Sequence, residues 1–112
     1  MQGYQLSFIT ELNRRIEGKA ATEWLLHQAK ELGISGVTTF SGTEGFGHDG
    51  RRHSVRFFEL ADQPIEIMMA TTAAQASKLF ANIGAADTRL FYIKTPIEYG
   101  ALGTQTAASG RP

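Results

Sequence analysis

The arrangement of apolar and polar residues along the chain predicts five extended segments. Residues 4–10 alternate between the two classes, which is typical of a strand with one buried face. Runs of β-branched and aromatic residues predict the other segments, at residues 36–41, 54–60, 65–70 and 89–95. Pro64 indicates a turn, or a bulge in one long strand, between the third and fourth segments, because proline has no N–H for the ladder. Pro96 is expected to end the last strand for the same reason.

Apolar residues spaced three or four positions apart predict two helices. The first covers residues 20–32, and Gly33 follows it where a helix end favours glycine. The second begins after Thr72, whose spacing from Gln75 fits a capping box. This second helix is expected to end at Gly84.

The order of these elements predicts an α+β fold, a ferredoxin-like βαββαβ sandwich with two helices on one face of an antiparallel sheet. Residues 13–19 and 42–53 are expected to be loops between its elements. Residues 1–99 fit a single domain, and the small and polar residues 100–112 are expected to form a flexible C-terminal tail. Because many functions occur on this fold, the function has to be argued from the site.

The predicted strands carry apolar side chains on both faces. Adjacent large apolar residues occur in four of the five: Phe8 with Ile9, Phe57 with Phe58, Ile67 with Met68 and Met69, and Phe91 with Tyr92. With both helices on one face, the other face would remain uncovered in a single chain. Exposed apolar patches of that size indicate association. We therefore expect an oligomer in which the open sheet faces pack together; chance scatter of apolar residues is the alternative.

Composition excludes several classes of protein. Eleven basic residues balance eleven acidic ones, so no overall charge attracts nucleic acid, and any anion site must be local. The absence of cysteine removes disulfides, thiolate metal sites and thiol nucleophiles. No apolar segment approaches the roughly 20 residues needed to cross a membrane, and residues 1–10 do not resemble a secretory signal. These observations indicate a cytoplasmic protein without membrane insertion.

The glycine-rich segment GTEGFGHDGRRH, residues 42–53, is the main candidate for a site. Its glycines allow the backbone to approach a ligand closely, and Arg51 and Arg52 could complete an anion site. A solvated loop is the alternative for both arginines. Phe46 either anchors the segment to the domain or offers a surface on which a base can stack. The segment lacks the lysine and Ser/Thr pair of a P-loop.

The same segment also contains candidate metal ligands. His48, Asp49 and His53 have side chains that suit zinc or copper, although a pair of solvent-exposed loop histidines is the favoured interpretation. The sequence offers no identifiable nucleophile–base pair or carboxylate pair. We therefore expect a protein that is not an enzyme and has no catalytic residues.

Two phrases, EGFGHDGRRHSVRFFELADQPIEI and RLFYIKTPIEYG, resemble the PII-like signalling proteins. They are most similar to the uncharacterised PII-like family called domain of unknown function 190, of the wider superfamily that also contains CutA. The resemblance extends over residues 3–103, and its most specific motif is GxEGFG at residues 42–47. It implies a homotrimer in which the three sheets face inward. It also implies that nucleotides bind in clefts between the subunits.

The resemblance also implies site residues. By position, Gly45, Phe46 and Gly47 match the start of the loop after the second strand in PII proteins. Arg89 matches a lysine that contacts phosphate, and Asp87 matches an acidic position in the same turn. With Arg51 and Arg52, these residues form the expected ligand-binding set. In PII proteins a glutamine–lysine pair follows the GFG motif, but His48 and Asp49 stand there in this chain. Only one glycine remains in the turn before the last strand, and the tyrosine-bearing loop tip and the downstream arginines are absent.

Three functional hypotheses follow. The leading one is a trimeric PII-like sensor that holds an adenine nucleotide or a small anion between subunits and acts on a partner protein through residues 42–53. The second is a metal-binding trimer of the CutA type that uses His48, Asp49 and His53. The third is a scaffold without a small ligand, which docks a membrane transporter or an enzyme.

Overall fold

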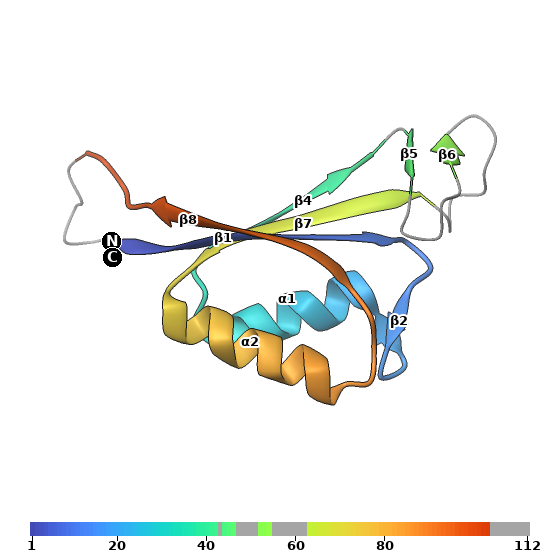
Figure 1. Cartoon of the computed structure of the whole chain (residues 1–112), viewed down its shortest axis with the longest axis horizontal. Helices are drawn as coiled ribbons and strands as arrows, with labels where there is room; N and C mark the ends of the chain where they lie inside the picture. The colour runs from blue at the N-terminus through green and yellow to red at the C-terminus, as the bar shows by residue number, and fades with distance from the viewer. Residues whose placement is uncertain (43, 47–51, 55–62, 104–112) are drawn as a thin grey trace.

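The computed structural model describes residues 1–42, 44–46, 52–54 and 63–103. Its main sheet contains four strands: β1 (Gln2–Glu11), β4 (Val37–Ser41), β7 (Pro64–Thr71) and β8 (Phe91–Glu98). The strand order is β4-β7-β1-β8, and all neighbours are antiparallel. Helices α1 (Ala21–Glu31) and α2 (Ala73–Ala85) both cover one face of the sheet, as Figure 1 shows. The predicted ferredoxin-like α+β sandwich is confirmed.

The predicted signals at two helix ends are confirmed. After α1, the N–H of Gly33 donates to the carbonyl oxygen of Lys30 at 3.2 Å, and the N–H of Ile34 donates to that of Ala29 at 2.9 Å. This is a Schellman ending, in which Gly33 takes the left-handed conformation with φ 75°. At the start of α2, Thr72 and Gln75 form both hydrogen bonds of a capping box.

The end of α2 differs from the prediction. The helix does not stop at Gly84 but continues to Ala85, with Ala86 as its C-cap residue. The residue with positive φ comes later, at Asp87, where φ is 54°. Gly84 was mistaken for the end because glycine is the usual residue in a left-handed C-terminal position, whereas aspartate also tolerates that conformation.

Residues 13–19 are not a simple loop. They contain β2 (Arg15–Ile16) and the start of β3 (Lys19–Ala20), which pair around a turn at Glu17 and Gly18. Both turn residues have positive φ, 51° and 82°, as a two-residue hairpin of type I′ requires. The hairpin carries Ile16 into the core, where its side chain is 1% exposed. Trp24 Nε1 on α1 donates to Glu17 Oε1 at 2.9 Å and holds the turn against the helix.

The glycine-rich segment also contains strands where the sequence predicted a loop. β5 (Glu44–Phe46) pairs antiparallel with β6 (Arg52–Ser54), with Gly45 opposite His53. Figure 1 shows this hairpin beyond the ends of β4 and β7. Apart from Ser54, the strand predicted over residues 54–60 lies outside the described residues.

Two prolines lie in strands rather than outside them. Pro64 is the first residue of β7, and its carbonyl oxygen accepts the N–H of Gly42 at 2.8 Å. The turn predicted next to it falls partly on residues 61–62, which are outside the described part. Pro96 does not end β8, which continues to Glu98. β8 is an edge strand, so the missing N–H of Pro96 breaks no ladder on its outer side.

The core lies between the sheet and the two helices. Strand residues that face the helices pack against the inner sides of α1 and α2, and Phe8 meets Phe80 edge to face with ring centroids 6.2 Å apart. The core comprises Leu6, Phe8, Ile16, Ala21, Trp24, Leu25, Ala29, Ile34, Ile65, Ile67, Met69, Ala76 and Leu79. Within the described residues, neither helix is long and apolar enough to span a membrane.

One core-facing side chain on β1 carries a hydroxyl without a partner. Thr10 pairs with Ile65, is 7% exposed, and its Oγ1 makes no hydrogen bond. We expect Thr10→Val to raise the free energy of unfolding by about 1 kcal/mol, because it removes a buried unpaired polar group without changing the shape of the side chain. Denaturant unfolding would measure it. Thr71→Val is the matched control, since Thr71 is also buried but its hydroxyl lies 3.5 Å from the carbonyl oxygen of Tyr4. A loss of stability in Thr10→Val would contradict the expectation.

Candidate functional site

The β5–β6 hairpin brings together residues from both ends of the glycine-rich segment. Cross-strand pairing places Phe46 opposite Arg52 and Gly45 opposite His53. Gly45 and Phe46, the first two residues of the GFG motif, thus pair with the strand that carries Arg52, one of the two candidate arginines. The other members of the predicted set in this segment, Gly47 and Arg51, lie outside the described residues and remain predictions.

The metal alternative rests on residues that are mostly outside the described part. His48 and Asp49 are among these, and only the backbone position of His53 in β6 is described. In the parts of the chain that the structure describes, no three His, Cys, Asp or Glu side chains are grouped closely enough to hold a metal ion. The predicted set His48, Asp49 and His53 therefore stays untested.

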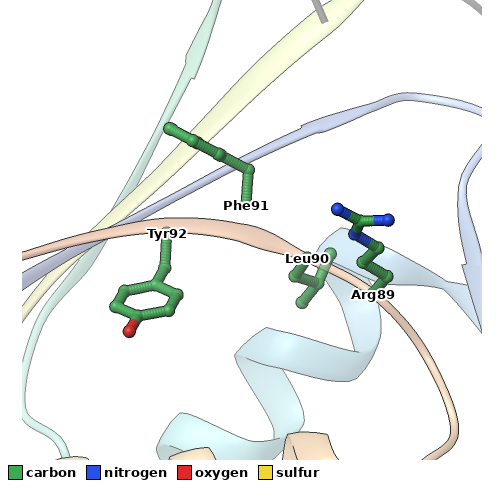
Figure 2. Close-up of a pocket in the computed structure, with 4 residues that line it drawn as sticks. All are labelled: Arg89, Leu90, Phe91 and Tyr92. Carbon is green, nitrogen blue, oxygen red and sulfur yellow. The ribbon is translucent and has the colours of Figure 1, made fainter. Parts of the chain in front are cut away.

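The second part of the candidate site lies just before β8. Arg89 and the first residues of the strand line a shallow hollow of about 240 Å³, whose other residues are Leu90, Phe91 and Tyr92. Figure 2 shows Phe91 and Tyr92 pointing to opposite sides of the strand, with the guanidinium of Arg89 beside its start. Tyr92 packs on Phe80 of α2, with ring centroids 4.8 Å apart, whereas Phe91 pairs with Ile9 on the other face.

Asp87 has a structural task that the sequence did not reveal. It follows the C-cap residue of α2 with φ 54°, so its backbone occupies the left-handed position that reverses the chain after the helix. Aspartate accepts this conformation more readily than most residues do, and glycine accepts it without strain. The residue type at this position is therefore explained by the turn, whether or not its carboxylate contacts a ligand.

Two substitutions separate these roles. We expect Asp87→Ala to be about 1 kcal/mol less stable than Asp87→Gly, because alanine is strained at positive φ. Thermal or denaturant unfolding would measure the difference. Equal stability of the two variants would contradict the proposed role of the turn. If the carboxylate also contacts a ligand, both variants should lose affinity equally despite their different stabilities.

Arg14 is a residue at this site that sequence reasoning missed. Its Nη1 donates to the carbonyl oxygen of Arg89 at 2.9 Å, although the two residues are 75 positions apart. Arg14 lies just before the β2–β3 hairpin, within the segment predicted to be a polar loop. Nothing in the local sequence marks it, because the contact depends on the sheet placing the end of β1 beside the start of β8.

The two parts of the candidate site lie at the same end of the sheet but at opposite edges. Ser41, the last residue of β4, is opposite Ile65 on β7, and Ile65 is opposite Thr10 on β1. Phe91, the first residue of β8, is opposite Ile9, next to Thr10. Three strand spacings of about 4.8 Å therefore separate the two edges by about 14 Å. The β5–β6 hairpin and Arg89 do not form one compact pocket within a single chain.

The face of the sheet away from the helices carries exposed apolar side chains. Cross-strand register places Ile9, Phe91 and Ile93 together on β1 and β8, while Phe40 lies on the same face of β4. All four are among the exposed large hydrophobic residues. Polar residues interrupt the face, since Ser7 and Gln5 also lie on it. The predicted apolar character of both sheet faces is thus present in the described strands.

The fold of this chain is similar to the folds of solved PII-like proteins. CPII from Thiomonas intermedia K12, a nitrogen regulatory PII-like protein solved with ADP, AMP and bicarbonate, superposes with a TM-score of 0.64 at 18% sequence identity. The match covers 89% of this chain and 97% of CPII. A protein from Thermus thermophilus described as a putative PII-like signaling protein also gives a TM-score of 0.64, at 13% identity, over 87% of this chain and 88% of its own. The chain therefore has the PII-like form of the ferredoxin-like fold.

The family itself is identified by sequence. Residues 3–98 match the family model DUF190, described as Uncharacterized ACR. The chain belongs to the DUF190 family, as the GxEGFG motif and the RLFYIK strand indicated. The match ends at residue 98, where β8 ends.

Proposed function

We propose that this protein is a non-enzymatic PII-like sensor that acts as a homotrimer. It binds an adenine nucleotide or a small anion between subunits and signals to a partner protein through residues 42–53. The observation that carries the proposal is that β4, which leads to the β5–β6 hairpin, and β8, which follows Arg89, are opposite edges of the sheet, about three strand spacings or about 14 Å apart. We call the hollow lined by residues 89–92 the Arg89 corner. A ligand that contacts both the β5–β6 hairpin and the Arg89 corner would sit where the hairpin of one subunit meets β8 of another.

The open face of the sheet supports the oligomer. Ile9, Phe91 and Ile93 form an uncovered apolar surface next to the candidate site, and contact with another copy would remove it from water. Phe91 also lines the hollow at Arg89, so the same residue belongs to the apolar face and to the site. Assembly and ligand binding would therefore share an edge of the sheet.

The chemistry of the corner supports an anionic ligand. Arg89 supplies a fixed positive charge with planar donors that suit phosphate or carboxylate oxygens. Glycines at the hairpin allow backbone N–H groups to approach the same ligand. CPII, which shares the fold, was solved with ADP, AMP and bicarbonate. Adenine nucleotides and bicarbonate are therefore the first ligands to test on this chain.

Calorimetric titration with ADP, AMP, ATP and bicarbonate tests the proposal. We expect at least one of them to bind the wild-type protein, and Arg89→Met to weaken that binding about tenfold or more, since a hydrogen-bonded charge pair is lost. Lys30→Met is the matched control. Lys30 is an exposed cation in the last turn of α1, at the opposite end of the helix from Ala21, whose N–H contacts Arg14. The proposal fails if none of the four ligands binds, or if Arg89→Met and Lys30→Met bind equally well.

A further inference from the structure

We propose that Arg14 is the positioning residue for Arg89 and the second cation of that corner, and that the pair takes a phosphoryl group rather than a singly charged carboxylate. The inference rests on the proposed function, because it specifies the ligand class of the same site. It adds a residue from the segment between β1 and β2, which the GxEGFG motif and the β8 motif do not contain.

The backbone of Arg14 is held on both sides. Its N–H donates to the carbonyl oxygen of Glu11 at 3.0 Å, which closes the turn after β1. Its carbonyl oxygen accepts the N–H of Ala21, the first residue of α1, at 2.8 Å. Arg14 is thus fixed between the end of a central strand and the start of a helix, and its side chain is half-buried. Such a side chain starts from a defined position, so it loses less conformational entropy on contacting a ligand.

The guanidinium of Arg14 in turn fixes the backbone of Arg89. The hydrogen bond from Nη1 to the Arg89 carbonyl oxygen holds the backbone two residues before β8, where the chain arrives from the turn at Asp87. A guanidinium has five N–H donors, and this contact uses one of them. The remaining donors leave Arg14 able to contact an anion beside Arg89.

The charges at this corner select the ligand class. Because Arg14 donates to the Arg89 carbonyl oxygen, the positive charges of both side chains belong to this corner, and an anion that contacts both would offset their mutual repulsion. A phosphoryl group with nearly two negative charges and three acceptor oxygens matches two guanidinium groups better than a single negative charge does. We therefore expect the corner to discriminate between nucleotides and bicarbonate through Arg14.

Arg15 provides an internal control of the same residue type. It is adjacent in sequence but exposed, and its Nη1 donates to the carbonyl oxygen of Gly18, at 3.3 Å, within its own hairpin. It makes no hydrogen bond to the Arg89 segment among the contacts of the described residues. Replacing Arg14 or Arg15 therefore removes the same charge from the chain, but only Arg14 holds the corner.

The test compares Arg14→Met, Arg14→Lys and Arg15→Met in the full chain by calorimetric titration with ADP and with bicarbonate, together with thermal melting. We expect Arg14→Met to weaken ADP binding about tenfold and bicarbonate binding much less, and Arg15→Met to leave both unchanged. Arg14→Lys should be intermediate, about threefold weaker for ADP, because lysine keeps the charge and one donor but not the planar fork.

The outcomes separate this inference from the proposed function. If the wild-type protein binds none of ADP, AMP, ATP and bicarbonate, the proposed function itself fails. If it binds bicarbonate but no nucleotide, the proposed function stands and this inference is overturned. If the wild-type protein binds ADP but Arg14→Met binds it equally well, or if Arg15→Met loses as much affinity, only the role of Arg14 is overturned. A purely structural role would lower the melting temperature of Arg14→Met and leave its affinity for ADP unchanged. Should Arg14→Met fail to fold, wild-type affinity in Arg14→Lys would overturn the proposal.

Discussion

Replacing Ile93 with arginine should convert the assembled protein into a monomer. Ile93 is on the open face of edge strand β8, opposite Ser7 and next to Phe91 along the apolar stripe, and its side chain is 47% exposed in the single chain. In the proposed trimer this face is buried, and an unpaired charge there would cost several kcal/mol per subunit. The stability of one folded chain should change little, because Ile93 contributes nothing to the core between sheet and helices. Size-exclusion chromatography with light scattering would report the mass.

Leu26→Arg is the matched control for this experiment. Leu26 lies on α1 and is 45% exposed, nearly the same as Ile93, but it is not on the open face of the sheet. Because α1 covers the other face, this substitution should leave the assembled mass unchanged. Two results would contradict the prediction: a wild-type protein that is already monomeric, or an Ile93→Arg variant that keeps the wild-type mass. The first would also remove the support that the open face gives to a site between subunits.

Gly3→Ala should destabilise the fold more than any other conservative substitution considered for this chain. A Cβ atom at Gly3 would overlap the carbonyl oxygen of Thr71 and lie 2.8 Å from Cε1 of Tyr99. The Thr71 carbonyl cannot move away easily, because Thr71 is fully buried and pairs with Tyr4 between β1 and β7. We expect a loss of about 3 kcal/mol in the free energy of unfolding, the upper part of the range for added atoms in a packed interior. Denaturant unfolding would measure it.

Gly84→Ala is the control, and its effect should have the opposite sign. Gly84 lies inside α2, and a Cβ atom built there meets nothing within 4 Å. Alanine in a helix is favoured over glycine by about 1 kcal/mol because it loses less backbone entropy on folding. We therefore expect Gly84→Ala to stabilise the protein. A loss of stability in Gly84→Ala would contradict the helical position of Gly84. Unchanged stability in Gly3→Ala would contradict the close contact between Gly3 and the Thr71 carbonyl oxygen.

Local signals explain which elements could be predicted. The capping box at Thr72 and the Schellman glycine at Gly33 depend on residues three to five positions apart, so the sequence was sufficient to locate those helix ends. The β2–β3 hairpin was missed because its turn has Glu17 at a positive φ, a position where glycine or asparagine is the usual signal. Pro96 was misjudged because proline is harmless on the outer side of an edge strand, and only the sheet order makes β8 an edge.

Some parts of the candidate site could likewise be predicted from the sequence, and others became visible only in the tertiary structure. The sequence determined that the protein is a ferredoxin-like domain of the DUF190 family, and it singled out the glycine-rich segment and Arg89. The fold follows from side-chain periodicity and the segment from its glycines and arginines, whereas the family and the interest of Arg89 come from the resemblance to known sequences. All of these signals are local in the sequence. Only the tertiary structure showed that Arg14 holds the carbonyl of Arg89, and that the β5–β6 hairpin lies at the opposite edge of the sheet from Arg89. Both facts depend on which strands become neighbours, and strand pairing is settled by the packing of the whole core and not by any one segment.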